Sequence, residues 1–491
     1  MAPHSVPASD RSRTLALVVL CAGMLMNILD QTIVSVALPS IQADLGFSQS
    51  GLAWVVNAYL IPFGGLLLLA GRLGDLVGRT RVFLAGLVVF TAASLLCGLA
   101  TSPGLLVGAR FLQGVGGALT SAVILGMIVR LYPEPGGQGR AIGAFSFAAA
   151  AGGSIGLIVG GLLTQALSWH WIFFVNVPIG LLVLAAARRL LARDRGLGLA
   201  AGADVAGGAL VTSGLMLGVY AIVGAADRGW LDATTLAVGG SSLALLAAFA
   251  VRQATAARPL LPLRLLRSRD VSGANAVQVL LVAGMFGFQF TSALYLQRVL
   301  GYEAAQVGLA ILPAAVAIGA LSLGASARLG ARFGSRAVLL PGLALIVVGL
   351  ALLARVPVDG RYAADVLPGV LLAGVGFGLG FPALTTLAMS GASADDSGLA
   401  SGLFNTTQQV GGALGLAVLA TLAAARTDSL AAAGGGTAAA LTGGYRLAFG
   451  VAAGLAATAL VLAAVVLRRP RPAPAGAIAP ADLEPATADA A

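Results

Sequence analysis

The chain has 491 residues, of which 58% are hydrophobic and 10% are charged, with a mean hydropathy of +0.95. Soluble domains carry about 25% charged residues, so the composition excludes a soluble protein and predicts a polytopic membrane protein. All 29 basic residues are arginine, which excludes a Walker A phosphate loop and Schiff-base chemistry, since both need lysine. The net charge of +10 does not indicate nucleic-acid binding, because the arginines lie between hydrophobic runs.

Fourteen apolar runs are long enough to cross a bilayer, which takes about 20 residues per helix. The first run carries Asp30 and extends to about Leu38, which is too long for a signal peptide. In chain order the runs lie near 15–38, 52–71, 82–100, 104–128, 140–164, 171–191, 205–226, 233–251, 271–297, 305–327, 337–356, 365–390, 398–425 and 446–467.

Arginine placement predicts the orientation of these spans. If alternate loops face the same side, 22 arginines lie on the side of both termini and 6 on the other, with Arg110 inside a span. By the positive-inside rule both termini are then cytoplasmic. Cys21 and Cys97 fall near opposite faces of the membrane, so we expect no disulfide.

Two segments recur at nearly the same offset. Residues 72–79 (RLGDLVGR) resemble residues 328–335 (RLGARFGS), and residues 152–157 (GGSIGL) resemble residues 411–416 (GGALGL), at offsets of 256 and 259 residues. Equal offsets predict two six-helix halves of parallel orientation with two helices inserted between them, as in transporters built from repeats.

These motifs carry a resemblance to a known family. Residues 71–81 (GRLGDLVGRTR), 29–39 (LDQTIVSVALP) and 110–116 (RFLQGVG) resemble motifs of the fourteen-helix drug:proton antiporters of the major facilitator superfamily, as do residues 169–180 and 402–412. The resemblance covers nearly the whole chain. It implies an all-α membrane protein of 14 transmembrane helices in a 6 + 2 + 6 arrangement that exports a drug in exchange for protons.

The expected organisation follows from the spans and the resemblance. It begins with a cytoplasmic N-terminus (1–14), a six-helix bundle (15–195) and two linker helices (196–252). A cytoplasmic loop (253–270), a second six-helix bundle (271–467) and a disordered cytoplasmic tail (468–491) follow.

Asp30 is the one acidic residue deep inside a predicted span. An ionised carboxylate at the bilayer centre costs at least about 2.5–3.5 kcal/mol, so Asp30 must face a cavity, pair with a cation or take up a proton. We predict that it carries the proton; a counter-ion for a cationic drug and a purely structural hydrogen-bonding acid are the alternatives. Arg110, the one deep basic residue, is its expected partner. The family resemblance implies a role for Arg110 in proton transfer, and a static ion pair is the alternative.

Polar side chains on several spans are candidates to line a central cavity or, alternatively, to hold neighbouring helices together. They are Asn27, Gln31, Asn57, Gln113, Gln289, Tyr295, Asn405, Gln408 and Gln409.

The loop after the second span is expected to act as a gate. It comprises Gly71, Gly74, Asp75, Gly78 and Arg79; the family resemblance implies that it latches the cytoplasmic side, and a plain topology anchor is the alternative. Asp75 is expected to accept hydrogen bonds from free N–H groups at the start of the third span. The three glycines are expected to permit a tight backbone.

The fifth span is expected to hold a hinge. It comprises Gly152, Gly156, Leu157, Gly160 and Gly161. The antiporter motif has proline where this chain has Leu157, and proline would remove a backbone hydrogen bond and kink the helix. The departure leaves room for a proton-independent importer or facilitator of a metabolite.

The predicted function is export of a hydrophobic or cationic drug, driven by the proton gradient, with no metal or other cofactor. A receptor that does not transport would need a large soluble partner-binding domain, and the sequence has none. An enzyme is also disfavoured, because the chain has only two histidines and no cluster of catalytic residues. We expect a monomer in a bacterial inner membrane, with lipid, drug and protons as partners and no nucleic acid.

Overall fold

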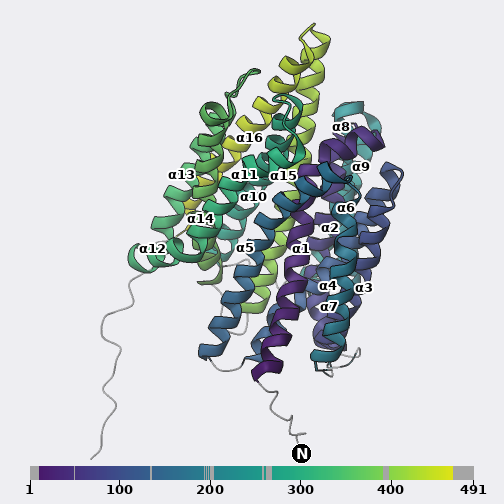
Figure 1. The fold of residues 1–491 in the computed structure, drawn as a ribbon, viewed down its shortest axis with the longest axis vertical. Coiled ribbons are helices and arrows are strands. Elements are labelled where there is room, and N and C mark those ends of the chain that lie inside the picture. Colours follow the sequence, from purple (N-terminus) through teal and green to yellow (C-terminus); the bar gives the residue numbers. More distant parts are fainter. Residues whose placement is uncertain are drawn as a thin grey trace, which may run out of the picture.

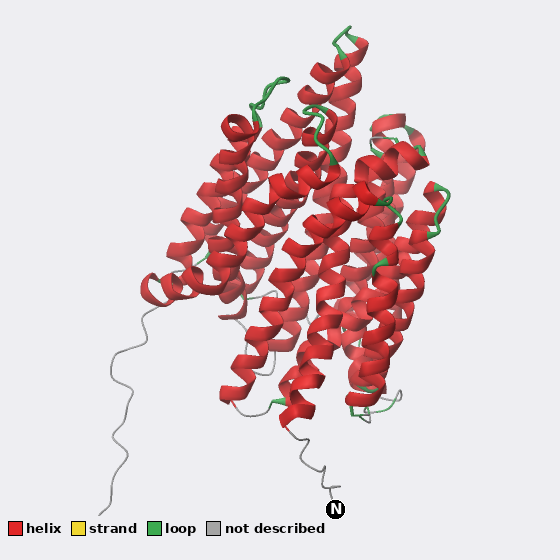
Figure 2. Ribbon diagram, in the orientation of Figure 1, coloured by secondary structure: helices red, strands yellow, loops and turns green. Residues whose placement is uncertain are grey.

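In the computed structural model of this chain, the described residues form helices joined by loops and turns, with no strand among them, as Figure 2 shows. It describes residues 10–48, 50–132, 135–192, 204–256, 259–260, 268–390 and 397–467, together with 194, 196 and 198. The expected N-terminal extension up to residue 9, half of the 253–270 loop and the expected tail from 468 lie outside these residues.

The first bundle contains the helices up to the linker. They are α1 (Asp10–Leu45), α2 (Trp54–Val77) after a short 3₁₀ turn (Gly51–Ala53), α3 (Arg79–Gly98), α4 (Pro103–Leu131), α5 (Pro135–Ala166), α6 (Trp171–Phe174) and α7 (Asn176–Leu190). The inserted pair is α8 (Val205–Arg228) and α9 (Ala233–Thr255).

The second bundle contains the remaining helices. They are α10 (Arg269–Arg298), α11 (Ala304–Ala320), a π-helical turn (Leu321–Ala325), α12 (Ser326–Phe333), α13 (Ser335–Leu353), a second π-helical turn (Tyr362–Val366), α14 (Leu367–Ser390), α15 (Ser397–Ala432) and α16 (Thr437–Val466).

Twelve of the described helices are long and apolar enough to cross a membrane. The other two expected spans, 140–164 and 305–327, coincide with α5 and α11, which contribute only the shorter apolar stretches Ile155–Ala166 and Ala304–Ala320. Only the described part of α5 enters this count, and α11 passes through a π-helical turn into α12, which carries Arg328 and Arg332. The structure therefore supports twelve spans, and fourteen stays a prediction.

The two bundles pack side by side. Within the first bundle, α1 packs on α5, and both α2 and α3 pack on α4. Within the second bundle, α10 packs on α15 and on α16, and α13 packs on α14. The seams between the bundles are α5 with α11, α2 with α15, and α1 with α10. In Figure 1 the green and yellow helices α10 to α16 lie together beside the purple and blue helices α1 to α4. The inserted helix α8 contacts both α2 and α15, so it covers one seam.

The sequence repeats occupy equivalent places in the two bundles. A Cβ on Gly160 of α5 would lie 2.7 Å from the carbonyl oxygen of Ile33 on α1, and a Cβ on Gly415 of α15 would lie 2.3 Å from Cα of Ala283 on α10. Glycines therefore let α5 approach α1 closely in the first bundle and let α15 approach α10 closely in the second. The paired loops also agree, because Gly78 and Gly334 both have positive φ, 109° and 88°, immediately before α3 and α13.

Candidate functional site

A buried ion pair joins α1 to α4 inside the first bundle. Nη1 of Arg110 lies 2.5 Å from Oδ2 of Asp30, and the two side chains are 1% and 0% exposed. The expected pairing of these two residues is therefore present. The carboxylate faces the interior of its own bundle.

Two neutral side-chain amides donate hydrogen bonds to the other oxygen of the Asp30 carboxylate. Gln113 Nε2 and Asn176 Nδ2 donate to Oδ1 of Asp30 over 2.7 and 2.9 Å. Gln113 lies one turn beyond Arg110, and its Oε1 accepts from Arg110 Nη1 over 2.7 Å. It also donates to Oγ of Ser94 on α3, so four helices contribute to one network. Both oxygens of the buried carboxylate therefore have hydrogen-bond donors.

Arg110 is held from the side of α2 as well. Its Nε donates to the carbonyl oxygen of Val55 over 2.9 Å, and its guanidinium lies 4.6 Å from the centre of the Tyr59 ring. The ring of Phe173 lies 5.7 Å away. Close approach of α2 and α4 depends on Gly114, where a Cβ would lie 2.3 Å from the carbonyl oxygen of Tyr59. Aromatic faces and a backbone carbonyl thus replace the hydration of the cation.

Sequence reasoning missed three members of this network, namely Ser94, Tyr59 and Asn176. Asn176 offered a signal, since it is an amide between apolar residues at the start of α7. Its partner lies 146 positions earlier in the chain, so only the fold brings the two together.

Three of the expected cavity residues lie elsewhere. Asn27 donates to Oγ1 of Thr120 and Oγ of Ser121, each over 2.8 Å, and so links α1 to α4. Gln113 belongs to the ion-pair network. Tyr295 donates to the carbonyl oxygen of Pro357 over 2.6 Å at one end of the second bundle. Each of these side chains makes at least one hydrogen bond within its own bundle, although the amide oxygen of Asn27 has no partner among the described residues.

Four more expected cavity residues do not line the central pocket. Asn405 is exposed on α15, and Gln408 is half-buried there. Gln409 lies at the seam, where its Cβ would come within 2.5 Å of a Cβ on Gly64 of α2. Asn57 is fully buried in α2, and neither atom of its amide has a hydrogen-bond partner among the described residues.

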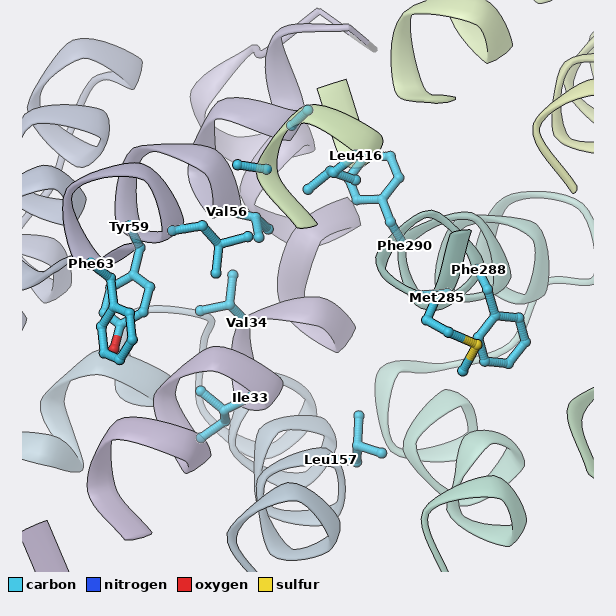
Figure 3. Packing of buried hydrophobic residues seen from close by; sticks show 14 of the residues in the cluster. Ile33, Val34, Val56, Tyr59, Phe63, Leu157, Met285, Phe288, Phe290 and Leu416 are labelled. Atoms are coloured by element: carbon cyan, nitrogen blue, oxygen red, sulfur yellow. The ribbon is translucent and has the colours of Figure 1, made fainter. Parts of the chain in front are cut away.

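The remaining two, Gln31 and Gln289, face each other's bundle across a small pocket. Its volume is about 20 Å³, and it is lined by residues of α1, α2, α10 and α15, namely Gln31, Ser35, Leu38, Val56, Phe286, Gln289, Phe290 and Leu416. Figure 3 shows Val34, Val56, Phe290 and Leu416 gathered where the two bundles meet. A pocket of this size holds a single water molecule, so the bundles are closed around it.

Hydrogen bonds hold the two bundles together at one end. Gln297 Nε2 donates to the carbonyl oxygen of Val36 over 2.9 Å, and Arg298 donates to Gln42. At the same end Gln165 of α5 donates to Glu303 beside α11. Among the described residues, the hydrogen bonds between the α1–α7 and α10–α16 bundles all lie at this end, away from the arginine-rich loops that carry Arg79 and Arg336.

The expected gating loop is built differently from the prediction. Gly78 has the positive φ that a tight turn needs, but Gly71 and Gly74 lie within α2. Gly74 instead permits contact with α4, since a Cβ there would lie 2.6 Å from Val123. Asp75 pairs with Arg79 over 3.1 Å, and Arg79 Nη1 donates to the carbonyl oxygen of Gly126 on α4.

Asp194, not Asp75, satisfies the free N–H groups of α3. Its carboxylate accepts from the backbone N–H of Arg79 over 2.8 Å and of Thr80 over 3.1 Å. Burial by itself raises the pKa of Asp194, but these two N–H groups, together with Arg130, bring that pKa below its usual range. The prediction for Asp75 was wrong because the residue that supplies the cap comes from the linker, 115 positions away.

The glycines expected to form a hinge in α5 serve close packing. Gly152, Gly156 and Gly160 face α1, where a Cβ on Gly156 would lie 3.0 Å from the carbonyl oxygen of Leu29. Gly161 faces Ala304 and Ala305 at the start of α11, and the carbonyl of Leu157 lies against Gly308. Helix α5 is continuous and joins its own bundle to the other one. The described residues contain no group of three or more His, Cys, Asp or Glu side chains that could hold a metal ion.

Comparisons with known proteins agree with this architecture. The model of the Major Facilitator Superfamily matches residues 20–416. The puromycin resistance protein pur8 of Streptomyces alboniger is 39% identical over 460 residues, covering 93% of this chain and 91% of that protein. The cephamycin export protein CmcT of Amycolatopsis lactamdurans is 39% identical over 418 residues, covering 84% of this chain and 86% of that protein.

A solved structure shares the fold. A bacterial homologue of the human lysosomal transporter Spinster, in an inward-facing and unoccupied conformation, superposes with a TM-score of 0.67 at 17% identity. The match covers 95% of this chain and 100% of that one. Relatives and fold alike are those of multi-pass membrane transporters.

Proposed function

Because the chain belongs to the Major Facilitator Superfamily and is a membrane transporter rather than an enzyme, we propose that it exports a hydrophobic or cationic antibiotic in exchange for protons, with Asp30 as the proton carrier. Relatives with 39% identity are named as an antibiotic resistance protein and an antibiotic export protein, which supports export of an antibiotic here. The proton gradient is the energy source, and no cofactor takes part.

One observation carries the coupling. Asp30 and Gln31 are neighbours in α1, and their side chains belong to two different sites. Asp30 enters the ion-pair network of the first bundle, whereas Gln31 lines the pocket that the second bundle closes. Any shift of α1 that alters one site therefore alters the other.

Protonation of Asp30 supplies such a shift. A neutral carboxyl no longer balances Arg110, so a buried guanidinium is left without its counter-charge, which is strongly unfavourable. Relief requires Arg110 to move toward water or another acceptor, and α1 then repacks against α4. The pocket at Gln31 changes shape when α1 repacks. Proton uptake at Asp30 is thereby linked to drug binding in the pocket, because both sites include residues of α1.

The proposed arrangement has fourteen spans, with α5 and α11 crossing the membrane as well as the twelve longer helices. Both termini are cytoplasmic, because the arginine-rich loops lie on their side. The hydrogen bonds between the bundles then lie at the extracellular end, which they help to keep closed. We propose that one chain suffices for transport, in a bacterial plasma membrane.

The test is proton release from purified protein in detergent on addition of puromycin or a cephamycin. The wild-type protein is expected to release protons, and Asp30→Asn to bind the compound without release. Asp30→Glu, which keeps an ionisable carboxyl, should restore part of the release. Asp232→Asn is the matched control, because Asp232 caps α9 far from the network and asparagine caps nearly as well. Equal release from wild type and Asp30→Asn would remove Asp30 from the mechanism.

A proton-independent facilitator is the second candidate function. Its supporting observation is that every oxygen of Asp30 already has a donor, so the pair also fits a static role. Transport of a metabolite by reconstituted protein, equal in both directions and indifferent to a pH gradient, would favour it over antiport.

A further inference from the structure

The central pocket presents one glutamine from each bundle. Gln31 comes from α1 and Gln289 from α10, both are half-buried, and both line the same small cavity. The other polar group at the pocket is the hydroxyl of Ser35. The rest of the lining is aliphatic or aromatic, with Phe286 and Phe290 supplying the two rings.

The two glutamines are related by the internal repeat. They are separated by 258 residues, between the offsets of 256 and 259 that relate the two repeated motifs. The helices α1 and α10 are the first of their bundles, and each contributes one of these carboxamides to the lining of the pocket. The pocket therefore offers the same chemistry from both of its walls.

That chemistry is uncharged. No charged side chain lines the pocket, and the nearest buried charges, Asp30 and Arg110, neutralise each other within the first bundle. An ion placed there without a counter-charge would lose its hydration at a large cost. A carboxamide instead both donates and accepts hydrogen bonds, and it loses about 1–3 kcal/mol when buried with neither satisfied.

We infer that the pocket takes an uncharged molecule with an aromatic surface that carries both hydrogen-bond donors and acceptors, held between Gln31 and Gln289. The inference rests on the proposed export function and narrows it, since it excludes a permanent cation as the preferred cargo. In the closed conformation the pocket is too small for such a molecule. The glutamines must therefore part as the bundles separate and meet the ligand from opposite sides.

The test compares two probes that share one ring system. 1,8-Dihydroxyanthraquinone is neutral, and its derivative with a trimethylammonium side chain is a permanent cation. Binding of each to the full-length protein in lipid nanodiscs is measured by isothermal titration at constant pH, with no proton gradient. The neutral probe is expected to bind the wild-type protein at least about tenfold more tightly, because the pocket offers the cation no counter-charge.

The variants assign that preference to the two glutamines. Gln31→Leu and Gln289→Leu keep the size of the side chain, and each should weaken the neutral probe about tenfold through loss of its hydrogen bonds. Gln289→Glu should reverse the order and favour the cation. Thr458→Val, on the exposed face of α16, is the control and should change neither affinity. Melting temperatures of all variants identify any that fail to fold, and Gln→Asn replaces such a variant.

Several outcomes would overturn the inference. They are tighter binding of the cation to wild type, no binding of the neutral probe, or unchanged neutral binding in both leucine variants. Proton release is measured separately on the same samples. Glutamine-dependent binding without proton release would retain the pocket and reject antiport, whereas proton release that ignores both glutamines would do the opposite.

Discussion

The first helices of the two bundles, α1 and α10, differ most where the repeat makes them equivalent. Asp30 of α1 and Phe288 of α10 each stand directly before the glutamine that lines the pocket, Gln31 and Gln289. Both side chains are buried within their own bundles, and Figure 3 shows Phe288 and Met285 on the side of α10 away from Phe290. One bundle thus buries an ion pair at a position where the other buries a ring.

The rest of each bundle follows this division. Among the described residues, the buried ionised side chains are Asp30, Arg110 and Asp204, and none of them belongs to α10–α16. The polar cluster between α10 and α15 is neutral, with Thr407 donating to Asn275 over 2.7 Å. The comparison teaches that a repeat can preserve helix packing and the pocket wall while charge chemistry is confined to one half.

Removal of Arg110 should have the largest effect on folding stability and so show how the two bundles differ. Arg110→Ala leaves the Asp30 carboxyl in the bundle without its partner, which is expected to cost about 3–5 kcal/mol of folding stability. Phe288→Leu at the equivalent position of the other bundle should cost less than about 1.5 kcal/mol. Thermal unfolding of purified protein in detergent measures both.

The double variant Asp30→Asn with Arg110→Gln is the control for charge. It removes both ions and keeps polar groups of similar shape, so most of the lost stability should return. A double variant as unstable as Arg110→Ala would show that packing, rather than the unpaired carboxylate, caused the loss.

Close helix packing should prove equal in the two bundles. Gly160→Ala on α5 and Gly415→Ala on α15 each place a methyl group against the neighbouring backbone, at 2.7 and 2.3 Å. Each should cost about 1–3 kcal/mol through overpacking, as measured by the same unfolding assay.

Two glycines with open surroundings serve as matched controls, Gly153 on α5 and Gly454 on α16. Alanine at these sites should be neutral or stabilise by up to about 1 kcal/mol, because alanine favours helix over glycine. A large effect in one bundle and none in the other would contradict the equivalence of α1–α5 with α10–α15.

The smallest of the expected effects concerns helix capping at the two repeated loops, which precede α3 and α13. The α3 terminus is capped by Asp194, whereas the α13 terminus after Gly334 has no side-chain cap. Asp194→Ala should cost about 1 kcal/mol, and Ser335→Ala much less, by the same melting measurement.

The cap also carries a pH dependence. The pKa of Asp194 is lower in the folded protein, so its contribution to stability is present above its ordinary pKa of 3.8 and is lost as pH falls below that value. Wild type and Asp194→Ala should therefore converge in stability at acid pH. A constant difference across the acid range would show that the carboxylate is not what stabilises α3.

Much of the candidate site was predictable where one side chain is anomalous in its surroundings. Asp30 and Arg110 stand alone among apolar residues, so each could be expected to seek the other. The roles of Gln113, Asn176 and Asp194 were not predictable, because an amide or a loop carboxylate has many possible partners. Asn27 follows the stated alternative, because it links α1 to α4 instead of lining the cavity. The pattern along a helix predicts which residues share a face but not which neighbouring helix that face contacts.

The amino-acid sequence by itself determined a helical membrane protein with repeated halves, since hydrophobic length, arginine placement and glycine motifs act locally along the chain. Only the tertiary structure decided that Asp30 pairs with Arg110 inside its own bundle while Gln31 and Gln289 line one pocket between the bundles. It also decided that Asp194 caps α3 from the linker. These contacts join residues dozens to hundreds of positions apart, and their geometry depends on how helices pack rather than on any local pattern.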